Sequence, residues 1–367
     1  MEKVMSRKLI PISTIMTLMS TSVMADVPNV AADIAPIHSL VSKVMDGVGE
    51  PKLVIQSGAS PHGYRLRPSE AKALQDANLI FWMGEELTPW LDGAIDTLAS
   101  NASVTSLLDQ EGVVLHEFRE GALFEAHDHS AHDDHDDHDD HDDHDDHDDH
   151  DDHDDHDDHD DHDDHDDHDD HDDHKDHDDH DDHDDHKDHD DHDDHGHGAH
   201  DPHAWLSPEN AKLWLNIIAS KLSVADPENA ASYFTNAAAG QAEIEDMVAE
   251  VSATLKPVQG GKFVVFHDAY QYFENDFDFY ASGAISLGDA SDPSPARIAE
   301  IQRRIQEEGI QCVLAEPQYK KGLVATVMEG SNATASVIDP LGADIKPGPK
   351  LYTQLIKNMA KTLRDCL

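Results

Sequence analysis

Three histidines lie at points where a folded chain would present a side chain rather than bury it. Their motifs are SPHGYRLRPS at 60–69 around His62, DPHAWLSP at 201–208 around His203, and VVFHDAYQYFE at 264–274 around His267. His62 and His267 follow apolar runs that read as strands, and ligands of open α/β sheets bind beyond the carboxyl ends of strands. Three imidazoles plus one position taken by a carboxylate or water can hold Zn²⁺ tetrahedrally. Together they predict a zinc site, whereas any one of them alone would more often be structural.

A second set of histidines forms a repetitive tract at 127–200. The tract holds 26 His and 41 Asp among 74 residues, without a large apolar side chain. A step of three residues turns a helix by about 300°, so these histidines would not share one face. Without apolar side chains nothing offsets the entropy of ordering. We therefore expect a disordered loop that offers shallow mixed nitrogen and oxygen metal sites, or else a solubilising spacer.

The negative charge of the chain is concentrated in this tract. It carries −39 of the formal net charge of −54, which leaves −15 for the other 293 residues. Phosphate contacts need clustered Lys and Arg, so a chain of this balance has no nucleic acid partner. An anionic membrane surface would repel it for the same reason.

The first 25 residues have the pattern of a secretory signal peptide. Lys3, Arg7 and Lys8 precede a mostly apolar stretch, and Val23-Met24-Ala25 offers a small-residue cleavage site. The alternative is a membrane anchor, but the stretch is shorter than the roughly 20 apolar residues that a span needs. We expect a periplasmic protein that does not itself span the membrane.

Short apolar runs alternate with amphipathic stretches through the rest of the chain. Buried strands are predicted at 53–55, 79–83, 263–266, 313–314 and 337–338. Helices are predicted after Ser207-Pro208 and Ser294-Pro295, where a capping residue precedes proline. This alternation is typical of α/β layers with parallel sheets.

One stretch, 228–256, contains a single glycine and no proline and predicts a continuous helix that ends at Pro257. Its predicted length is about 40 Å at 1.5 Å per residue, which is enough to join two lobes. The resulting fold class is α/β, with two lobes of parallel sheets flanked by helices, one long rigid connecting helix and a metal cleft between the lobes. The expected boundaries are 1–25 for the signal peptide, 26–225 for the first lobe with its disordered loop at 127–200, 226–257 for the connecting helix, and 258–367 for the second lobe.

Cys312 and Cys366 are the two cysteines of the chain. In an oxidising compartment an even pair is most simply a disulfide, and the alternative is two unrelated thiols.

Five motifs in order, SPHGYRLRPS, DPHAWLSP, FHDAYQYF, AEPQY and VIDPLGADI, resemble the periplasmic zinc-binding proteins of ABC transporters, the ZnuA type. The resemblance covers nearly all of the chain between the signal peptide and the C-terminus, apart from the tract. It implies that His62, His203 and His267 bind zinc, and that Cys312 pairs with Cys366. It also implies a monomer with small lobe motions that delivers its ion to a permease in the inner membrane.

The sequence leaves two alternatives for the fourth ligand of the zinc ion. Some relatives carry a carboxylate just before the first histidine, but this chain has Pro61 there. Asp339 matches the aspartate that completes the site in related manganese-binding members, so it either coordinates the ion, leaving water out, or caps the turn at Pro340. We expect Glu316 to orient neighbouring groups, and Tyr270 and Trp205 to shape the cleft. His38 and His116 are expected to be surface or satisfied histidines.

These features favour a zinc-capture protein over an enzyme, with Zn²⁺ as the transported ligand. The runner-up is a protein of the same type for manganese or another divalent metal. A zinc-dependent hydrolase is a third possibility, but the sequence contains no His-Glu-x-x-His helix. A metal-buffering or adhesive protein, in which the tract itself is the function, is the fourth.

Overall fold

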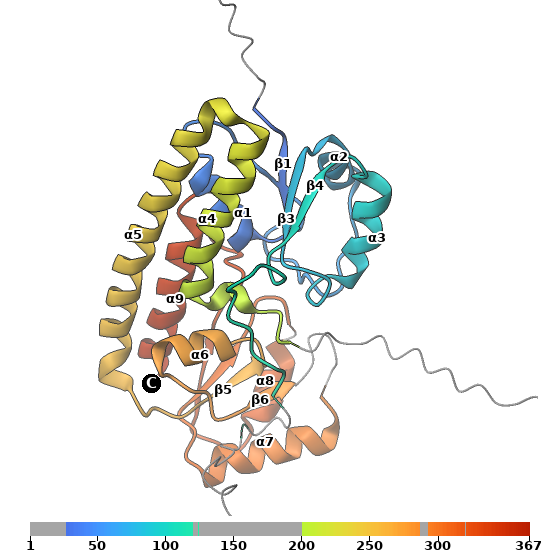
Figure 1. The fold of residues 1–367 in the computed structure, drawn as a ribbon. Coiled ribbons are helices and arrows are strands. Elements are labelled where there is room, and N and C mark those ends of the chain that lie inside the picture. Colours follow the sequence, from blue (N-terminus) through green and yellow to red (C-terminus); the bar gives the residue numbers. More distant parts are fainter. Residues whose placement is uncertain (1–26, 120–123, 125–199, 287–292, 320) are drawn as a thin grey trace, which may run out of the picture. The chain divides into compact units, whose positions relative to one another are not determined.

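Two four-stranded parallel sheets form the framework of this computed structural model (Figure 1). The structure describes residues 27–119, 124, 200–286, 293–319 and 321–367. The predicted signal peptide, and the predicted disordered loop up to residue 199, lie outside the described residues. Within the described part, residues of both sheets belong to one compact unit.

The first sheet has the strand order β2-β1-β3-β4. Its strands are β1 (Val30–Ala32), β2 (Lys52–Leu53), β3 (Leu79–Trp82) and β4 (Ser103–Ser106), all paired in parallel. The helices that alternate with these strands are α1 (Ala35–Val44), α2 (Pro68–Asp76) and α3 (Pro89–Leu98). Figure 1 shows α2 and α3 on the face of the sheet away from α1. The sheet is therefore covered on both faces, as parallel sheets require.

The second sheet repeats this order as β6-β5-β7-β8. Its strands are β5 (Phe263–His267), β6 (Ala284–Ser286), β7 (Cys312–Ala315) and β8 (Thr334–Val337). The helices of this half are α6 (Gln271–Phe277), α7 (Pro295–Glu307), α8 (Lys321–Val327) and α9 (Leu351–Cys366). Side chains of β5 alternate between two cores: Phe263 and Val265 join the large one shared with the first sheet. Val264 and Phe266 join a smaller core that includes Ile301 of α7.

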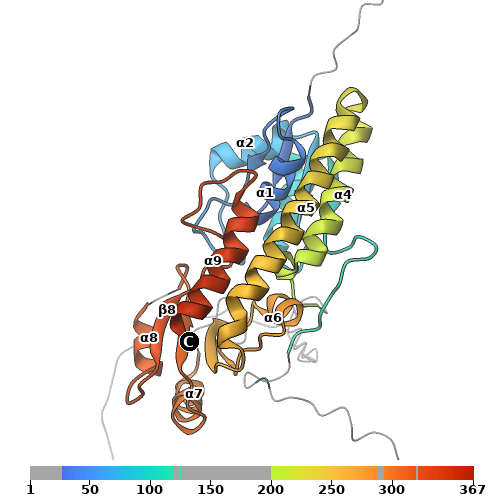
Figure 2. The ribbon, with the colours of Figure 1, turned by 90° about the vertical axis from the view of Figure 1, so that its left-hand side faces the viewer.

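A layer of long helices connects the two sheets. Figure 2 shows α4 (Pro208–Ala225), α5 (Ala230–Leu255) and α9 running side by side with α1, and these helices contact one another. The 26 residues of α5 span about 39 Å. Its buried positions recur every three or four residues, from Tyr233 to Leu255, as on one face of a helix. Gly240 lets α4 approach closely, because a Cβ at this position would lie only 2.9 Å from Cδ1 of Leu215.

The helix starts follow the capping pattern of the sequence. Ser207 accepts a hydrogen bond from the backbone N–H of Asn210 at 3.3 Å, and Ser294 accepts one from Arg297 at 3.2 Å. In each case a proline occupies the first turn. The expected connecting helix is confirmed as α5, which begins after a short 3₁₀ turn at Pro227–Asn229 and ends before another at Lys256–Val258.

A disulfide joins Cys312, at the start of β7, to Cys366, at the end of α9. It fastens the C-terminal helix to the amino-terminal end of a central strand. Among the described helices, none has both the length and the apolar character needed to cross a bilayer. The expected fold class, two parallel α/β sheets joined by one long helix, is confirmed for the described residues.

Candidate metal site

The structure brings His62, His203 and His267 together although they are far apart in the sequence. One nitrogen of each ring lies within 4.8 Å of a nitrogen of the other two. His267 is the last residue of β5, His62 lies in the connection between β2 and α2, and His203 directly precedes the 3₁₀ turn Ala204–Leu206. The three predicted imidazoles thus form the one cluster of three or more metal-ligand side chains found within the described part of the chain.

The three rings face a small pocket. Its walls are Ser60, Pro61, His62, His203, Trp205, His267, Glu316, Gln318, Tyr319, Pro340 and Leu341. The free space is about 10 Å³, which is room for one sphere of the size of a water molecule. His203 and His267 are buried, whereas His62 is half-buried. A space of this size fits a single ion.

The spacing of the rings suits a metal ion. The ring centroids are 5.2 Å apart for His203 and His267, 5.5 Å for His62 and His203, and 6.4 Å for His62 and His267. Zinc bonds of 2.0–2.1 Å at tetrahedral angles would place ligand nitrogens about 3.4 Å apart. The ring nitrogens, which lie within 4.8 Å of one another, are therefore close to the separation that three zinc ligands require.

His203 is oriented by Asp201, two residues before it. The Asp201 carboxylate oxygen Oδ1 lies 2.7 Å from the ring nitrogen Nδ1 of His203 and 2.9 Å from its backbone N–H. Both side chains are 2% exposed, so the contact is not diluted by solvent. Such a carboxylate favours the tautomer with the proton on Nδ1, leaves the lone pair on Nε2 and increases the basicity of the ring as a metal ligand.

His267 has a carboxylate partner of the same kind. Its Nδ1 lies 2.6 Å from Oε1 of Glu316, and both side chains are buried. Glu316 follows the end of β7, the strand that pairs with β5. The interpretation of Glu316 as an orienting group agrees with this contact. Burial and the nearby Glu316 carboxylate raise the pKa of Tyr270 well above its usual value, so this phenol, 6.3 Å from the His267 ring, stays protonated.

His62 is held by the loop that carries it. The indole Nε1 of Trp90 donates to the carbonyl of Pro61 at 2.7 Å. Tyr64 donates to Glu70 at 2.8 Å, and Glu70 in turn accepts from the backbone N–H of Arg67 at 2.7 Å. The loop is therefore fastened to α2 and α3 on both sides of the histidine.

Asp339 does not belong to the cluster. Its Oδ1 accepts the backbone N–H groups of Leu341 and Gly342 at 3.0 Å each, and its Oδ2 accepts that of Ala343. Gln318 also donates to Oδ1 at 3.4 Å. The carboxylate is thus occupied by the turn that follows it, while that same turn supplies Pro340 and Leu341 to the pocket wall.

The other two histidines outside the tract lie elsewhere. His38 is buried in α1, with Nε2 3.1 Å from the carbonyl of Pro51 and Nδ1 3.4 Å from the Ser42 hydroxyl. His116 is half-buried, packs against Tyr272 with the ring centroids 4.6 Å apart and the rings tilted, and contacts Asn275. Burial lowers the pKa of both rings. Trp205 lines the pocket as expected and donates its indole N–H to Pro340 at 2.8 Å.

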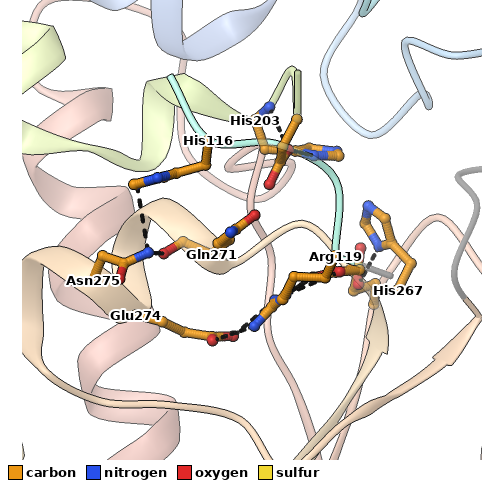
Figure 3. A network of polar contacts seen from close by, with 10 residues as sticks. His116, Arg119, His203, His267, Gln271, Glu274 and Asn275 are labelled. Carbon is orange, nitrogen blue, oxygen red and sulfur yellow. Dashed lines mark hydrogen bonds and ion pairs between the residues drawn. The ribbon is translucent and has the colours of Figure 1, made fainter. Parts of the chain in front are cut away.

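Two residues near the site were not predicted from the sequence. Figure 3 shows Arg119 beneath His267, extended toward Glu274. It pairs with both Glu274 and Asp268, the residue after His267. Asp201, the partner of His203, was also missed. An aspartate two residues before the histidine was the available signal for Asp201; nothing in the sequence around Arg119 marked it.

Two α/β lobes on a long helix, with three imidazoles meeting between their sheets, define a two-lobed metal-binding protein. The family model described as zinc-uptake complex component A periplasmic, ZnuA, matches residues 30–366. A high-affinity zinc uptake system protein ZnuA of Brucella abortus is 46% identical over 338 residues, which cover 92% of this chain and 91% of that protein. The counterpart of Paracoccus denitrificans is 43% identical, covering 94% of this chain and 93% of the other. The chain belongs to the ZnuA family.

Solved structures show the same fold at lower sequence identity. The crystal structure of a 138–173 ZnuA deletion mutant with zinc bound aligns with a TM-score of 0.65 at 18% identity, covering 93% of this chain and 98% of the other. The solute-binding protein FpvC of Pseudomonas aeruginosa in complex with Mn²⁺ aligns with a TM-score of 0.63 at 15% identity, covering 92% and 97%. At such identity these likenesses support the fold and leave the choice of metal to the site residues.

Proposed function

We propose that this chain captures one Zn²⁺ in the periplasm with His62, His203 and His267 and delivers it to an ABC permease in the inner membrane. The observation that carries the proposal is the cluster of three ring nitrogens within 4.8 Å of one another. Membership of a periplasmic zinc-uptake family supports the transport role. The protein acts as a monomeric carrier rather than an enzyme, in keeping with its membership of a zinc-uptake family. The space inside the pocket accommodates one ion.

Zinc is the proposed cargo because of the donor set. Neutral imidazoles suit zinc, whereas manganese prefers carboxylate and other oxygen ligands. The two carboxylates nearest the rings, Asp201 and Glu316, each hydrogen-bond an imidazole. Asp339 is held by its own turn, so we assign the fourth position to water and the capping role to Asp339.

The organisation of the chain is part of this proposal. We assign 26–225 to the first lobe, 226–257 to the connecting helix and 258–367 to the second lobe, with 1–25 removed on export. The large core includes residues of both sheets and of α5 and α9. A shared core favours small lobe displacements on binding over a wide hinge motion.

Zinc competition on alanine variants tests the ligand assignment. His62→Ala, His203→Ala and His267→Ala are each titrated as the full mature chain against a chromophoric chelator tight enough to strip weaker sites. We expect the tight site to weaken at least about 100-fold in each variant, because one of three metal bonds is lost. His38→Ala is the matched control, since His38 is also buried but hydrogen-bonds Pro51 instead. Parent affinity in all three pocket variants would refute the assignment.

A further inference from the structure

The most highly connected charged side chain near the pocket is Arg119. Its Nε lies 3.0 Å from both carboxylate oxygens of Asp268, and its Nη1 lies 2.7 Å from Oε2 of Glu274. The ring of Phe124 covers the guanidinium at 3.5 Å. The side chain of Arg119 is 16% exposed, that of Asp268 is 8% and that of Glu274 is 1%. This is a buried, multiply bonded ion network and not a surface salt bridge of small effect.

The partners of Arg119 belong to the half of the molecule that carries His267. Asp268 is the next residue in the chain after His267, and Glu274 lies on α6. Both carboxylates are buried, and Arg119 is ion-paired with each of them. Removing the guanidinium would therefore leave two buried acids without a counter-charge, directly beside the main chain of His267.

Arg119 also lies in a short segment, 116–119, that supports the residues beside His203. Glu117 pairs with His200 in an antiparallel β-bridge, and the backbone N–H of Asp201 donates to the carbonyl of His116 at 2.8 Å. Tyr272 on α6 donates its hydroxyl to the carbonyl of Asp201 at 2.7 Å. The segment at 116–119 is thereby bound on one side to Asp201, the partner of His203, and on the other to Asp268.

The chain enters and leaves the His/Asp tract through this same bridge. Arg119 and Glu117 stand just before residue 120, and His200 and Asp201 directly follow residue 199. The two polar supports of the pocket on this side, Asp201 on His203 and Arg119 on Asp268, are thus contributed by the segments that flank the tract in the sequence. Figure 3 shows Arg119 reaching across from this segment toward Glu274, below His203 and His267.

We propose that Arg119 is a positioning residue for the metal site: it fixes Asp268, and through it His267, relative to the bridge that orients His203. The inference rests on the proposed function. It adds a group that touches no ligand ring and acts through the residue beside one.

Three substitutions in the full mature chain test this role. In Arg119→Ala we expect zinc affinity at the tight site to fall about 10-fold, the lower limit for the loss of a group that supports a metal ligand. In Arg119→Lys, a cation that reaches one carboxylate at a time, we expect partial recovery. Arg304→Ala is the matched control, because the Arg304 side chain is 15% exposed and pairs with Glu308, the residue that follows α7, away from the pocket. It should keep the parent affinity.

A second pair of variants separates positioning from general stability. Asp268→Asn and Glu274→Gln each remove one buried partner of Arg119, so both should lower the thermal midpoint of the metal-free protein. Only Asp268→Asn should also weaken zinc binding by several-fold, since residue 268 adjoins His267. Equal zinc affinity in the two variants would overturn the inference, even if Arg119→Ala does not fold.

His267→Ala in the same competition assay distinguishes the ligand role of His267 from the positioning role of Arg119. If His267→Ala loses the tight site while Arg119→Ala and Asp268→Asn bind zinc like the parent, the positioning role is wrong and the ligand assignment survives. If His267→Ala itself binds zinc like the parent, His267 is not a ligand and the positioning role of Arg119 fails with it; if His62→Ala and His203→Ala do so too, the proposed function is wrong. A loss in His267→Ala together with a smaller loss in Arg119→Ala and Asp268→Asn supports both.

Discussion

The two sheets share one strand order, yet their central strands end in different chemistry. β1 and β5 occupy equivalent places in the orders β2-β1-β3-β4 and β6-β5-β7-β8. β1 is followed by Asp33, whose Oδ2 accepts the backbone N–H of Met83, the residue after β3, at 2.8 Å. β5 ends in His267, whose ring contacts Glu316, the residue after β7, at 2.6 Å. At the end of the central strand, the first lobe therefore has a carboxylate that hydrogen-bonds the backbone, whereas the second lobe has an imidazole that can bind a metal ion.

The strand order of each sheet determines where a ligand site can form, and the side chain at that point determines whether it binds a ligand. Carboxyl ends of neighbouring parallel strands meet at a crevice where a ligand can bind. In the first lobe Asp33 fills that place, and the lobe contributes His62 instead from the connection after the edge strand β2. In the second lobe the central strand itself contributes His267. The pocket is therefore assembled from non-equivalent positions of two similar sheets.

The disulfide is found in the second lobe, and its removal should have the largest effect on stability. Replacing Cys312 and Cys366 by serine should lower the unfolding free energy by roughly 4 kcal/mol, because a closed loop with a sequence separation of 54 restricts the unfolded chain. Zinc affinity should stay within about twofold, since Cys312 starts β7 while Glu316 follows its other end. Urea unfolding of the metal-free protein and chelator competition measure the two quantities.

Reduction of the parent protein provides the control for that prediction. Added reductant should lower the urea midpoint of the parent to that of the double serine variant and leave the variant unchanged. A tenfold loss of zinc affinity in a folded variant would mean that the disulfide also positions the carboxyl end of β7.

Asp33 should make stability depend on pH in the opposite direction to an ordinary ion-paired acid. Burial raises its pKa from 3.8 to about 7, against the backbone N–H groups of Met83 and Ile34, which lower it. A raised pKa in the folded state contributes stability that is fully present below about pH 4 and is lost as the pH rises toward 7. From the three-unit shift, the loss is about 3 to 4 kcal/mol between pH 4 and pH 8.

Asp33→Asn isolates this contribution. The difference in unfolding free energy between parent and variant should shift by about that amount, against the parent, as the pH rises from 4 to 8. Asp76→Asn serves as the control, because the Asp76 side chain is 53% exposed and pairs with Lys72 on the surface. A difference that stays constant with pH would show that the Asp33 carboxyl is ionised throughout.

Strands with large apolar side chains could be predicted from the sequence, and those without could not. The runs at 79–83 and 263–266 correspond to β3 and β5 within one residue. β1, β4 and β6 were missed, because VAA, SVTS and AIS contain few large apolar residues and their pairing depends on neighbouring strands. The predicted run at 337–338 overlaps β8 by one residue, since β8 is the exposed edge segment TASV.

Some residues of the site could likewise be predicted from the sequence, and others could not. The three histidines were recognisable because each stands beside a strand or helix boundary in a distinct motif. Arg119 was not, because its role depends on a contact across 149 residues of sequence with Asp268. The position of Asp339 was ambiguous for a physical reason: an aspartate before Pro-Leu-Gly is an equally good turn cap and metal ligand, and only the folded turn shows its carboxylate accepting backbone N–H groups.

The smallest expected effect tests the comparison between Asp33 and Glu316 most directly. Glu316→Gln keeps a hydrogen-bond acceptor for Nδ1 of His267 but removes the negative charge that raises the basicity of the ring. We expect zinc affinity at the tight site to fall about 10-fold, or about 1.4 kcal/mol.

Asp33→Asn makes the same change of carboxylate to amide at the carboxyl end of a strand of the other sheet, and should leave zinc affinity at the parent value. Chelator competition at one pH compares the two variants. If both lose affinity equally, the effect of Glu316 would be general to a buried acid at the carboxyl ends of the central strands. If neither does, the contact of Glu316 with His267 would be structural alone. A loss confined to Glu316→Gln is expected, because the ring that Glu316 contacts faces the pocket, whereas the groups that Asp33 contacts are backbone amides of its own sheet.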